Sequence, residues 1–223
     1  ARFAAMARAC DHVLAGNAFL ARHATAFNPA VTLVPTCIDA ARYRVEASKP
    51  ADSLDLVWIG SRSTRKYLAE AMPWLAGAAQ AVPGLRLKIV ADFDLPGCGV
   101  TTLPVAWRAE SEAHELAASH IGIAPMRDDD WSRGKCALKV LQCMAAGLPV
   151  VSSKAGANAE VIDDGVHGFL AATPGEWAEG IERLAQDADL RRRRGGAGRR
   201  RMAADYSIEP VFDRLRPVIA KLG

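Results

Sequence analysis

The stretch from Gly134 to Ser153, GKCALKVLQCMAAGLPVVSS, holds residues whose types and spacing suit the binding of an anion. Lys135, Lys139 and Gln142 follow one another at steps of four and three residues, so a helix places all three on one face. The first turn of a helix also offers unpaired N–H groups and about half a positive charge. The pattern predicts an anion site, although an ordinary helix–strand unit with solvated lysines would share it.

A second stretch, Gly60 to Lys66 (GSRSTRK), combines a flexible glycine, hydroxyl side chains and cations where a strand gives way to a helix. Backbone amides at a helix start and cationic side chains are ligands that suit phosphate. The stretch lacks the G-x-x-x-x-G-K-[ST] spacing of a P-loop and the G-x-G-x-x-G spacing of a dinucleotide fold. It therefore indicates either a phosphate loop of another kind or a plainly capped helix.

Three further loops contain candidate ligand-binding residues. Trp107 could stack on a nucleobase, or simply pack against the protein. Three successive aspartates, at 128–130, resemble a metal-binding run, but no histidine or further carboxylate stands nearby at ligand spacing. They fit a polar loop with helix-capping aspartates better, and we expect no metal. The small residues around Gly156 would let backbone amides approach an anionic or hydroxylated ligand closely.

The elements that must position these residues follow from the pattern of apolar residues. A helix is predicted over residues 135–146, where Gly147 and Pro149 end it, and a strand follows over 150–153. Other strands are predicted over 54–60, 85–91, 101–105, 120–125 and 167–171, with helices over 64–81, 110–118 and 158–163 and again after 171. Pro73 should kink or divide the helix over 64–81. The alternation predicts an α/β fold with a doubly wound parallel sheet, whose ligands bind at the carboxyl ends of the strands.

The first 53 residues do not follow the regular alternation of strands and helices that the rest of the chain shows. A helix end over 1–10, a strand over 11–16, a helix capped by Asn17 and a strand over 31–35 make a β–α–β piece too small to bury both faces of a sheet. This piece needs a partner, either a segment that the sequence does not contain or another chain. Residues 39–53 have the composition of an inter-domain linker. Farther along, a turn rich in glycine and proline is expected through Gly97 and Gly99.

Composition narrows the class of protein. Half of the 223 residues are hydrophobic, and the net charge of +3 is too small to imply a nucleic-acid partner. No apolar run approaches the roughly 20 residues of a membrane span, and the first residues, which begin without methionine, do not resemble a secretory signal. The five cysteines are scattered, and the five histidines form no motif. We therefore expect no metal or redox site, and a cytoplasmic protein. The cysteines are Cys10, Cys37, Cys98, Cys136 and Cys143.

One segment is strongly basic: residues 191–201 contain seven arginines in eleven positions, interrupted by Gly-Gly-Ala-Gly. Such a block can hold anionic lipid or nucleic acid, and binding to lipid would make the protein peripheral at the inner membrane face. The other interpretation is a solvated pair of helices separated by a glycine break. Salt-sensitive binding to anionic vesicles would support the lipid interpretation.

Several of these stretches together resemble a known family. GKCALKVLQCMAAGLPVVSS, followed by GANAEVIDDGVHGFL and DADLRRRRGGAGRRRMAADYS, is similar to the donor-binding half of glycosyltransferase family 4. VWIGSRSTRKYL resembles the first strand and phosphate loop of that half, and HVLAGNAFLARHATAFNPAVTLVPTCIDAARY resembles the end of the preceding half and the hinge. The resemblance covers nearly the whole chain. It implies a retaining transferase of the GT-B fold that uses a UDP- or GDP-linked sugar without a metal ion.

The resemblance further implies a division into four parts. They are the end of an N-terminal acceptor domain (1–38), an inter-domain linker (39–53), a Rossmann-like nucleotide-sugar donor-binding domain (54–207) and a C-terminal helix (208–223). Most of the acceptor domain would be missing, so we expect the isolated chain to bind donor weakly and to transfer nothing. The incomplete N-terminal segment could self-associate. Whether the acceptor is a glycan, a lipid or a small molecule is not indicated.

Individual residues take roles from the same resemblance. Lys66 matches the loop lysine that contacts the donor diphosphate, and the family's preceding arginine falls on Ser61, with Arg62 beside it as a substitute. The family's paired glutamates, eight positions apart, fall on Gly134 and Gln142. Gln142 can still hydrogen-bond a ribose hydroxyl as donor or acceptor, but glycine cannot replace a carboxylate near the transferred sugar.

Lys135 and Lys139 could compensate by contacting the leaving phosphates, so we expect the catalytic positions to be Lys66, Lys139 and Gly134. Donor binding is expected at Gly60, Ser61, Arg62, Lys66, Trp107, Lys135, Cys136, Ala137, Leu138, Lys139, Gln142 and Gly156. Two alternatives stay open. One is a catalytically inactive nucleotide-sugar-binding module, which the missing acids would explain. The other is a different nucleotide-sugar enzyme, such as an epimerase, for which no acid–base set is visible.

Overall fold

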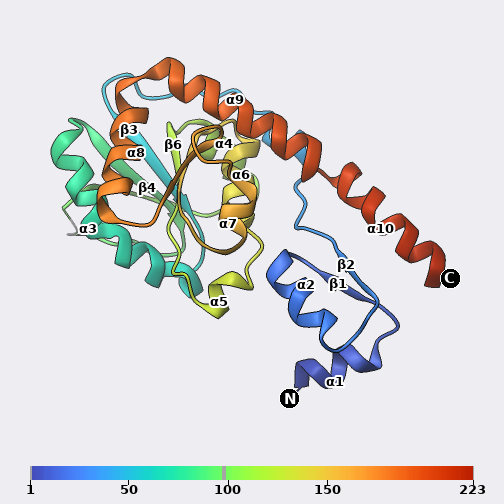
Figure 1. Ribbon diagram of the computed structural model, residues 1–223. Helices are drawn as coiled ribbons and strands as arrows, with labels where there is room; N and C mark the ends of the chain where they lie inside the picture. The colour runs from blue at the N-terminus through green and yellow to red at the C-terminus, as the bar shows by residue number, and fades with distance from the viewer. Residues whose placement is uncertain (1, 97–98, 223) are drawn as a thin grey trace.

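The computed structural model, which describes residues 2–96 and 99–222, contains the parallel sheet that the apolar runs predict. Its strands are β3 (Leu54–Ile59), β4 (Leu85–Ala91), β5 (Thr101–Ala106), β6 (Ile121–Ala124), β7 (Val150–Ser153) and β8 (Gly168–Ala171). They pair in parallel in the order β5-β4-β3-β6-β7-β8 (Figure 1). The order reverses between β3 and β6, and in such sheets the reversal opens a crevice at the carboxyl ends of the strands.

Helices cover both faces of this sheet, which explains the nearly continuous apolar runs of its central strands. Successive residues of β3 enter different cores: Leu56 and Trp58 belong to one, and Val57 and Ile59 to the other. The first core is covered by α3 (Arg65–Ala81) and α8 (Pro174–Gln186). The second is covered by α4 (Glu112–Ala117), α6 (Leu138–Ala145), α7 (Gly156–Val161) and α9 (Ala188–Asp205). The predicted α/β class is therefore confirmed.

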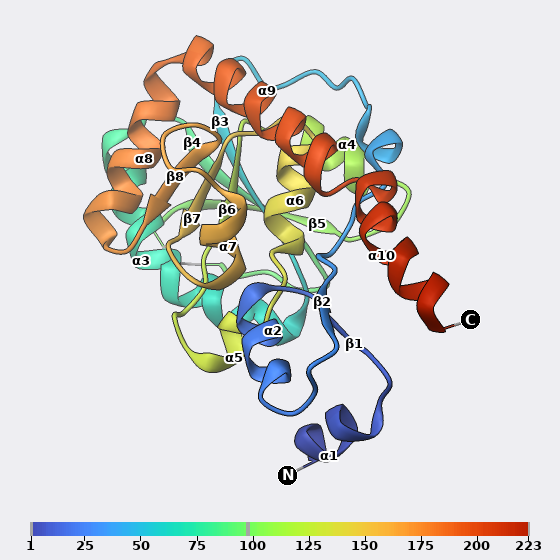
Figure 2. The same ribbon diagram turned by 45° about the vertical axis from the view of Figure 1, so that its right-hand side comes forward.

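The N-terminal residues form a separate small unit of α1 (Arg2–Ala9), β1 (Val13–Ala15), α2 (Ala18–Thr25) and β2 (Val31–Leu33). β1 and β2 make a two-stranded parallel sheet of their own. Asn17 caps α2 as predicted, because its side-chain oxygen accepts a hydrogen bond from the backbone N–H of Leu20 at 2.8 Å. Figures 1 and 2 show this unit beside α5 (Asp130–Arg133), below the sheet.

Between the two sheets the chain is not wholly irregular. A single 3-10 turn, η1 (Ala40–Tyr43), interrupts the expected linker, and the buried Tyr43 packs against the second core. The chain ends in the predicted helix, α10 (Ile208–Leu222). No helix of the described residues is long and apolar enough to cross a membrane. Of the turn expected through Gly97 and Gly99, residues 97 and 98 lie outside the described residues, and Gly99 has a φ of 76°.

α3 continues through Pro73, so of the two expected effects of this proline the helix is not divided. The basic helix differs from expectation. α9 is one continuous helix, so the expected glycine break in the arginine run is wrong. The reason is packing: a Cβ at Gly195 would collide with the carbonyl oxygen of Gly147, and one at Gly198 would lie 3.2 Å from Met144 Cγ. The glycines let α9 approach α6 closely rather than ending the helix.

Candidate functional site

A cavity of about 1160 Å³ lies at the carboxyl ends of β3 and β6, where the strand order reverses. Ile59 and Gly60 line it from the end of β3, and Ala124 and Pro125 line it from the end of β6. A cavity of this size is large enough for a ligand of the size of a nucleotide-sugar. Eleven expected site residues line it: Gly60, Ser61, Lys66, Trp107, Gly134, Lys135, Cys136, Ala137, Leu138, Lys139 and Gln142.

The segment from Gly134 to Ala137 is a loop, so the helix predicted from residue 135 begins later, at Leu138. Ala137 has a φ of 54°, a left-handed backbone conformation that a non-glycine residue rarely adopts. This loop folds back on α5, with the Lys135 N–H donating to the Ser132 carbonyl at 3.0 Å. Lys135 therefore reaches the cavity from a loop, while Lys139 and Gln142 reach it from α6.

Lys139 is partly buried in the cavity wall, and its ammonium lies 5.4 Å from the centre of the Trp58 ring. Burial, reinforced by the charge of Lys135, lowers the pKa of Lys139 to about 8. The packing of Lys139 against Trp58 also leaves no room for a side chain at position 60, which is a glycine. A Cβ there would lie 2.6 Å from Trp58 Cζ2 and 2.8 Å from Lys139 Cε, so a larger residue would displace both side chains.

Two other lysines surround Tyr67 on α3. The ammonium groups of Lys135 and Lys66 lie 4.4 and 5.0 Å from the centre of its ring. Burial raises the pKa of Tyr67. The hydrogen bond from Ser132 and the nearby charges of Lys135 and Lys66 together outweigh burial, so the pKa of Tyr67 is lowered overall. None of the cavity lysines, at 66, 135 or 139, forms an ion pair with a carboxylate of the described residues. The cavity thus holds three cationic groups without an anionic partner in that part of the chain.

The loop after β3 is organised by its hydroxyl groups. The Thr64 hydroxyl donates to the Ser61 carbonyl at 3.0 Å, and the hydroxyls of Ser61 and Ser63 are 2.9 Å apart. Arg62 is not among the residues that line the cavity. Its exposed guanidinium pairs with the carboxylate of Asp92 at 2.8 Å, and Asp92 does line the cavity, so Arg62 lies beside the lining rather than in it.

Gly156 is the second expected site residue outside the cavity lining. Its φ of 48° and the 3.1 Å approach of a Cβ to the Arg133 Cα show that it serves close packing between α7 and α5. Asn158, two residues later, lines the cavity instead, and its amide donates to the Ser152 hydroxyl at 2.9 Å.

The aspartate run behaves as the capping interpretation predicts. The Asp129 side chain accepts from the Ser132 N–H at 2.7 Å and caps α5, while Asp128 and Asp130 pair with Arg133. Among residues 2–96 and 99–222, no group of three or more His, Cys, Asp or Glu side chains is placed to hold a metal ion.

The arginine run is engaged within the molecule. Arg192 pairs with Asp189 at 2.8 Å, Arg201 pairs with Asp163 at 2.8 Å, and the Arg191 guanidinium donates to the Ala185 carbonyl at 2.8 Å. These contacts leave fewer free charges for an anionic surface than the sequence alone indicates.

A hydrogen-bonded cluster in the cavity wall centres on Glu112, which the sequence did not single out. The carboxylate is 6% exposed, and it accepts hydrogen bonds from the Tyr43 hydroxyl, from Trp107 Nε1 at 2.7 Å and from Gln142 Nε2 at 2.9 Å. Its only signal in the sequence was an acid near the start of a predicted helix, which is common. Other lining side chains that were missed are Thr36, Trp58, Tyr67 and Asp92. Met126, Trp131 and Asn158, which also line the cavity, lie in the predicted ligand loops at 126–133 and 154–158.

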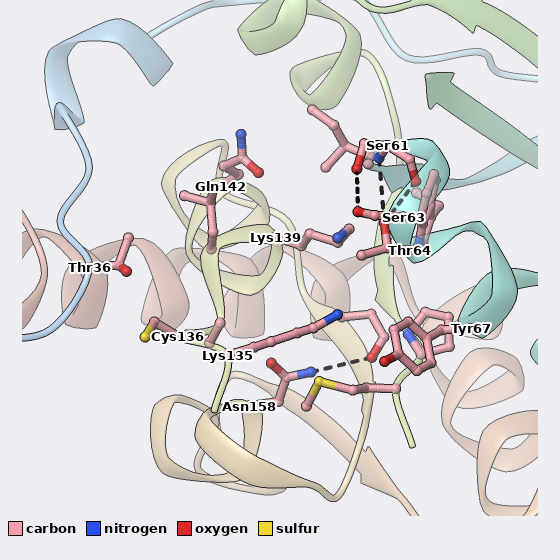
Figure 3. A pocket seen from close by; sticks show the side chains of 18 of the residues that line it. Thr36, Ser61, Ser63, Thr64, Tyr67, Lys135, Cys136, Lys139, Gln142 and Asn158 are labelled. Atoms are coloured by element: carbon pink, nitrogen blue, oxygen red, sulfur yellow. Dashed lines mark hydrogen bonds between the residues drawn. The ribbon is translucent and has the colours of Figure 1, made fainter. Parts of the chain in front are cut away.

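The site as a whole has a cationic part and a polar, aromatic part. Figure 3 shows Gln142 and Tyr67 on opposite sides of Lys139, with Ser61, Ser63 and Thr64 beyond it. A ligand with a diphosphate could meet Lys66, Lys135 and Lys139. A ring with hydroxyl groups could meet the hydrogen-bonding side chains near Gln142.

Comparison with known proteins gives this geometry a context. The family model described as "Glycosyl transferases group 1" matches residues 34–187. Among curated proteins, the chain is 34% identical over 83 residues to spore coat protein SA of Bacillus subtilis, covering 36% of this chain and 22% of that protein. It is 27% identical over 114 residues to alpha-D-kanosaminyltransferase of Streptomyces kanamyceticus, covering 50% of this chain and 29% of that protein.

Solved structures share the fold. Sucrose-phosphate synthase of Thermosynechococcus elongatus superposes with a TM-score of 0.76 at 18% identity, covering 98% of this chain and 60% of that one. Anabaena HepE, solved in complex with UDP and glucose, gives a TM-score of 0.75 at 16% identity, covering 95% of this chain and 64% of that one. The chain thus spans less than two thirds of the length of these two structures. The C-terminal domain of the group 1 glycosyl transferase LpcC of Francisella tularensis is covered to 99%, with 77% of this chain, at a TM-score of 0.60 and 16% identity.

Proposed function

The chain belongs to the group 1 glycosyl transferases, and from this premise we propose that it is the donor-binding half of a retaining, nucleotide-sugar-dependent family 4 enzyme. On this proposal residues 54–207 hold the donor, and residues 1–38 are the end of an acceptor domain. The 39–53 segment joins the two parts, and 208–223 form the closing helix. The observation that carries the proposal is the set of three cavity lysines without carboxylate partners, placed where the order of the parallel strands reverses.

In the proposed reaction, the donor diphosphate lies against Lys66, Lys135 and Lys139. The bond between the anomeric carbon and the diphosphate oxygen breaks, and the electron pair leaves with the diphosphate. The lysines stabilise the charge that develops on that oxygen, a role that needs no metal ion. The acceptor hydroxyl forms the new bond to the anomeric carbon, and its proton passes to the departing diphosphate.

The nucleotide is proposed to be UDP or GDP, with UDP as the first choice because HepE was solved with UDP. Trp107 supports a base-stacking position, since the residue is 50% exposed and lines the cavity. The loop amides from Cys136 to Leu138 are proposed to hold the sugar or phosphate end of the donor. The acceptor is a glycan, a lipid or a small molecule that a further part of the protein would bind.

A second candidate is a nucleotide-sugar-binding module without transferase activity. Gly134, where the resembling family has a glutamate, favours it because no side chain at that position can contact the transferred sugar. Turnover by a version with a complete acceptor domain separates the two candidates.

The proposal is tested by thermal shift and calorimetry with UDP, GDP and ADP and their hexose derivatives, with and without a chelator. A bound donor raises the melting temperature by mass action, and the chelator should change nothing. Replacing Lys139 by Met should weaken binding about tenfold or more, since hydrogen bonds to charged groups are worth roughly 1.5–3 kcal/mol. Replacing the exposed Lys221, outside the cavity, by Met should have no effect. Absence of any shift at millimolar nucleotide would refute the proposal.

A further inference from the structure

The amide of Gln142 is held in one orientation by the chemistry of its neighbour. A carboxylate has only acceptor atoms, whereas a glutamine amide has an NH2 group at one end and an oxygen at the other. Because Gln142 Nε2 donates to Glu112 Oε1 at 2.9 Å, one of its two N–H groups is used and the NH2 end of the amide is held beside Glu112. The carbonyl oxygen is then the only hydrogen-bond acceptor that the amide can offer a ligand, and it lies at the other end. Figure 3 shows the nitrogen of Gln142 turned away from Lys139 and the oxygen on the side of Ser61.

The other hydrogen-bond partners of Glu112 also favour this orientation of the Gln142 amide. Burial, followed by the hydrogen bond to Glu112, raises the pKa of Tyr43, so its hydroxyl stays protonated and donates. Trp107 Nε1 is a donor only, and it donates to Glu112 Oε2 at 2.7 Å. Both carboxylate oxygens therefore accept hydrogen bonds: Oε1 from the protonated Tyr43 hydroxyl and from Gln142, and Oε2 from Trp107, which can only donate. Turning the Gln142 amide would place its oxygen against Glu112 Oε1 and lose a hydrogen bond in a buried place.

We propose that Glu112 is a positioning residue that fixes the Gln142 amide so that its carbonyl oxygen accepts a hydrogen bond from a ribose hydroxyl of the donor nucleotide. This inference rests on the proposed function, because it presumes a nucleotide in the cavity. Gln142 then offers an acceptor, as a carboxylate would, but without a second negative charge beside Glu112 or near the diphosphate. Glu112 does not contact the ribose itself and affects its binding only by orienting Gln142.

The proposal predicts discrimination by the sugar hydroxyl. A carbonyl oxygen can bind a ligand that carries the hydroxyl, while a ligand that lacks it leaves this acceptor unsatisfied. The best-binding nucleoside diphosphate among UDP, GDP and ADP should therefore bind roughly tenfold more tightly than its 2′-deoxy or its 3′-deoxy form. Which of the two forms loses affinity identifies the hydroxyl.

The test compares four proteins by calorimetry: the wild-type chain, Glu112→Gln, Gln142→Glu and the double exchange. In Glu112→Gln the amide of Gln142 is free to turn, so discrimination between the ribose and deoxyribose ligands should fall at least threefold. Gln142→Glu places two carboxylates against each other, so binding should weaken about tenfold or more. In the double exchange, the amide at 112 donates to the carboxylate at 142, and affinity and discrimination should return to within about threefold of wild type.

Tyr43→Phe is the matched control. It removes a different hydrogen bond to the same carboxylate and leaves the bond between Glu112 and Gln142 in place. A merely structural role for Glu112 would make Tyr43→Phe and Glu112→Gln behave alike, whereas a positioning role changes discrimination only in Glu112→Gln. Melting temperatures show which variants are folded. If Glu112→Gln is unfolded, the comparison of Gln142→Glu with the double exchange still decides.

Two results would overturn the inference while the proposed function stands. One is a folded double exchange that binds no better than Gln142→Glu, and the other is a Glu112→Gln protein that discriminates as wild type does. Failure of every nucleoside diphosphate to bind the wild-type chain contradicts the proposed function itself, so the two failures are distinguishable.

Discussion

Lys139 is the cavity residue whose charge state depends most clearly on its surroundings. Burial and the neighbouring Lys135 lower its pKa to about 8, so the free protein loses this charge as pH rises through that value. A diphosphate would favour the protonated form and raise the pKa in the complex. The protonated form is therefore the one that binds, and binding takes up a proton above pH 8.

It follows that affinity for UDP should be steady below about pH 8 and should fall above it, by up to tenfold per pH unit, until the pKa of the complex is reached. Lys139→Arg should remove this fall, because a guanidinium stays charged over the whole range. The measurement is calorimetric titration of both proteins between pH 7.5 and 9.5, where any ionisation of the base affects both equally. Parallel profiles would show that Lys139 is not the titrating group.

Individual residues also show where sequence reasoning stops. The spacing of Lys135, Lys139 and Gln142 predicted that all three face one ligand site, and all three line the cavity. Lys135 nevertheless lies in a loop, because Ala137 adopts a left-handed backbone conformation that an alanine in the sequence does not predict. Glu112 was missed because its importance lies in a contact with Gln142, 30 residues away in the chain. Contacts of that kind become visible only once the sheet has brought two segments together.

Among the elements, the strands were the most predictable and the basic helix the least. Buried strands such as β3 and β6 read as nearly continuous apolar runs because both faces of a parallel sheet are covered. In α9 the glycines suggested a break, since local propensity disfavours glycine in a helix. Packing overrides that propensity: the close approach of α9 to the loop at Gly147 requires a residue without a side chain at Gly195.

Two neighbouring glycines of α9, Gly195 and Gly196, should respond differently to replacement by alanine. Gly195→Ala should lower the melting temperature by roughly 4 °C or more, because its Cβ would collide with the carbonyl oxygen of Gly147 and overpacking costs about 1–3 kcal/mol. Gly196→Ala, on the same helix, has only Arg200 Nη1 at 3.6 Å and should be neutral or stabilising by up to about 1 kcal/mol. Calorimetric unfolding of both variants checks this. Equal effects would mean that propensity, not packing, determines the cost.

Considered as a whole, the molecule links its N-terminal unit to the cavity loop by the hydrogen bonds of Asn17. Asn17 is 2% exposed, and its amide donates to the carbonyls of Arg133 at 2.9 Å and Lys135 at 2.8 Å. The same residue caps α2. A Cβ at Gly16 would lie 2.5 Å from Cys136 Sγ, so the two parts are also in close contact beside it. The conformation of the loop from Gly134 to Ala137 therefore depends on a unit that does not line the cavity with its own helices or strands.

Asn17→Ala should consequently reduce nucleotide affinity even though Asn17 does not line the cavity. The variant loses the helix cap, worth about 1 kcal/mol, and the two hydrogen bonds that hold the loop, so the Lys135 backbone is less well placed. We expect UDP affinity to fall roughly threefold to tenfold. Asn28→Ala is the control, because the Asn28 amide donates to Ala7 and Cys10, at 2.8 and 2.7 Å, within the N-terminal unit. Both variants should unfold at a lower temperature, but only Asn17→Ala should bind UDP more weakly; equal affinities would show that the loop keeps its conformation without the N-terminal unit.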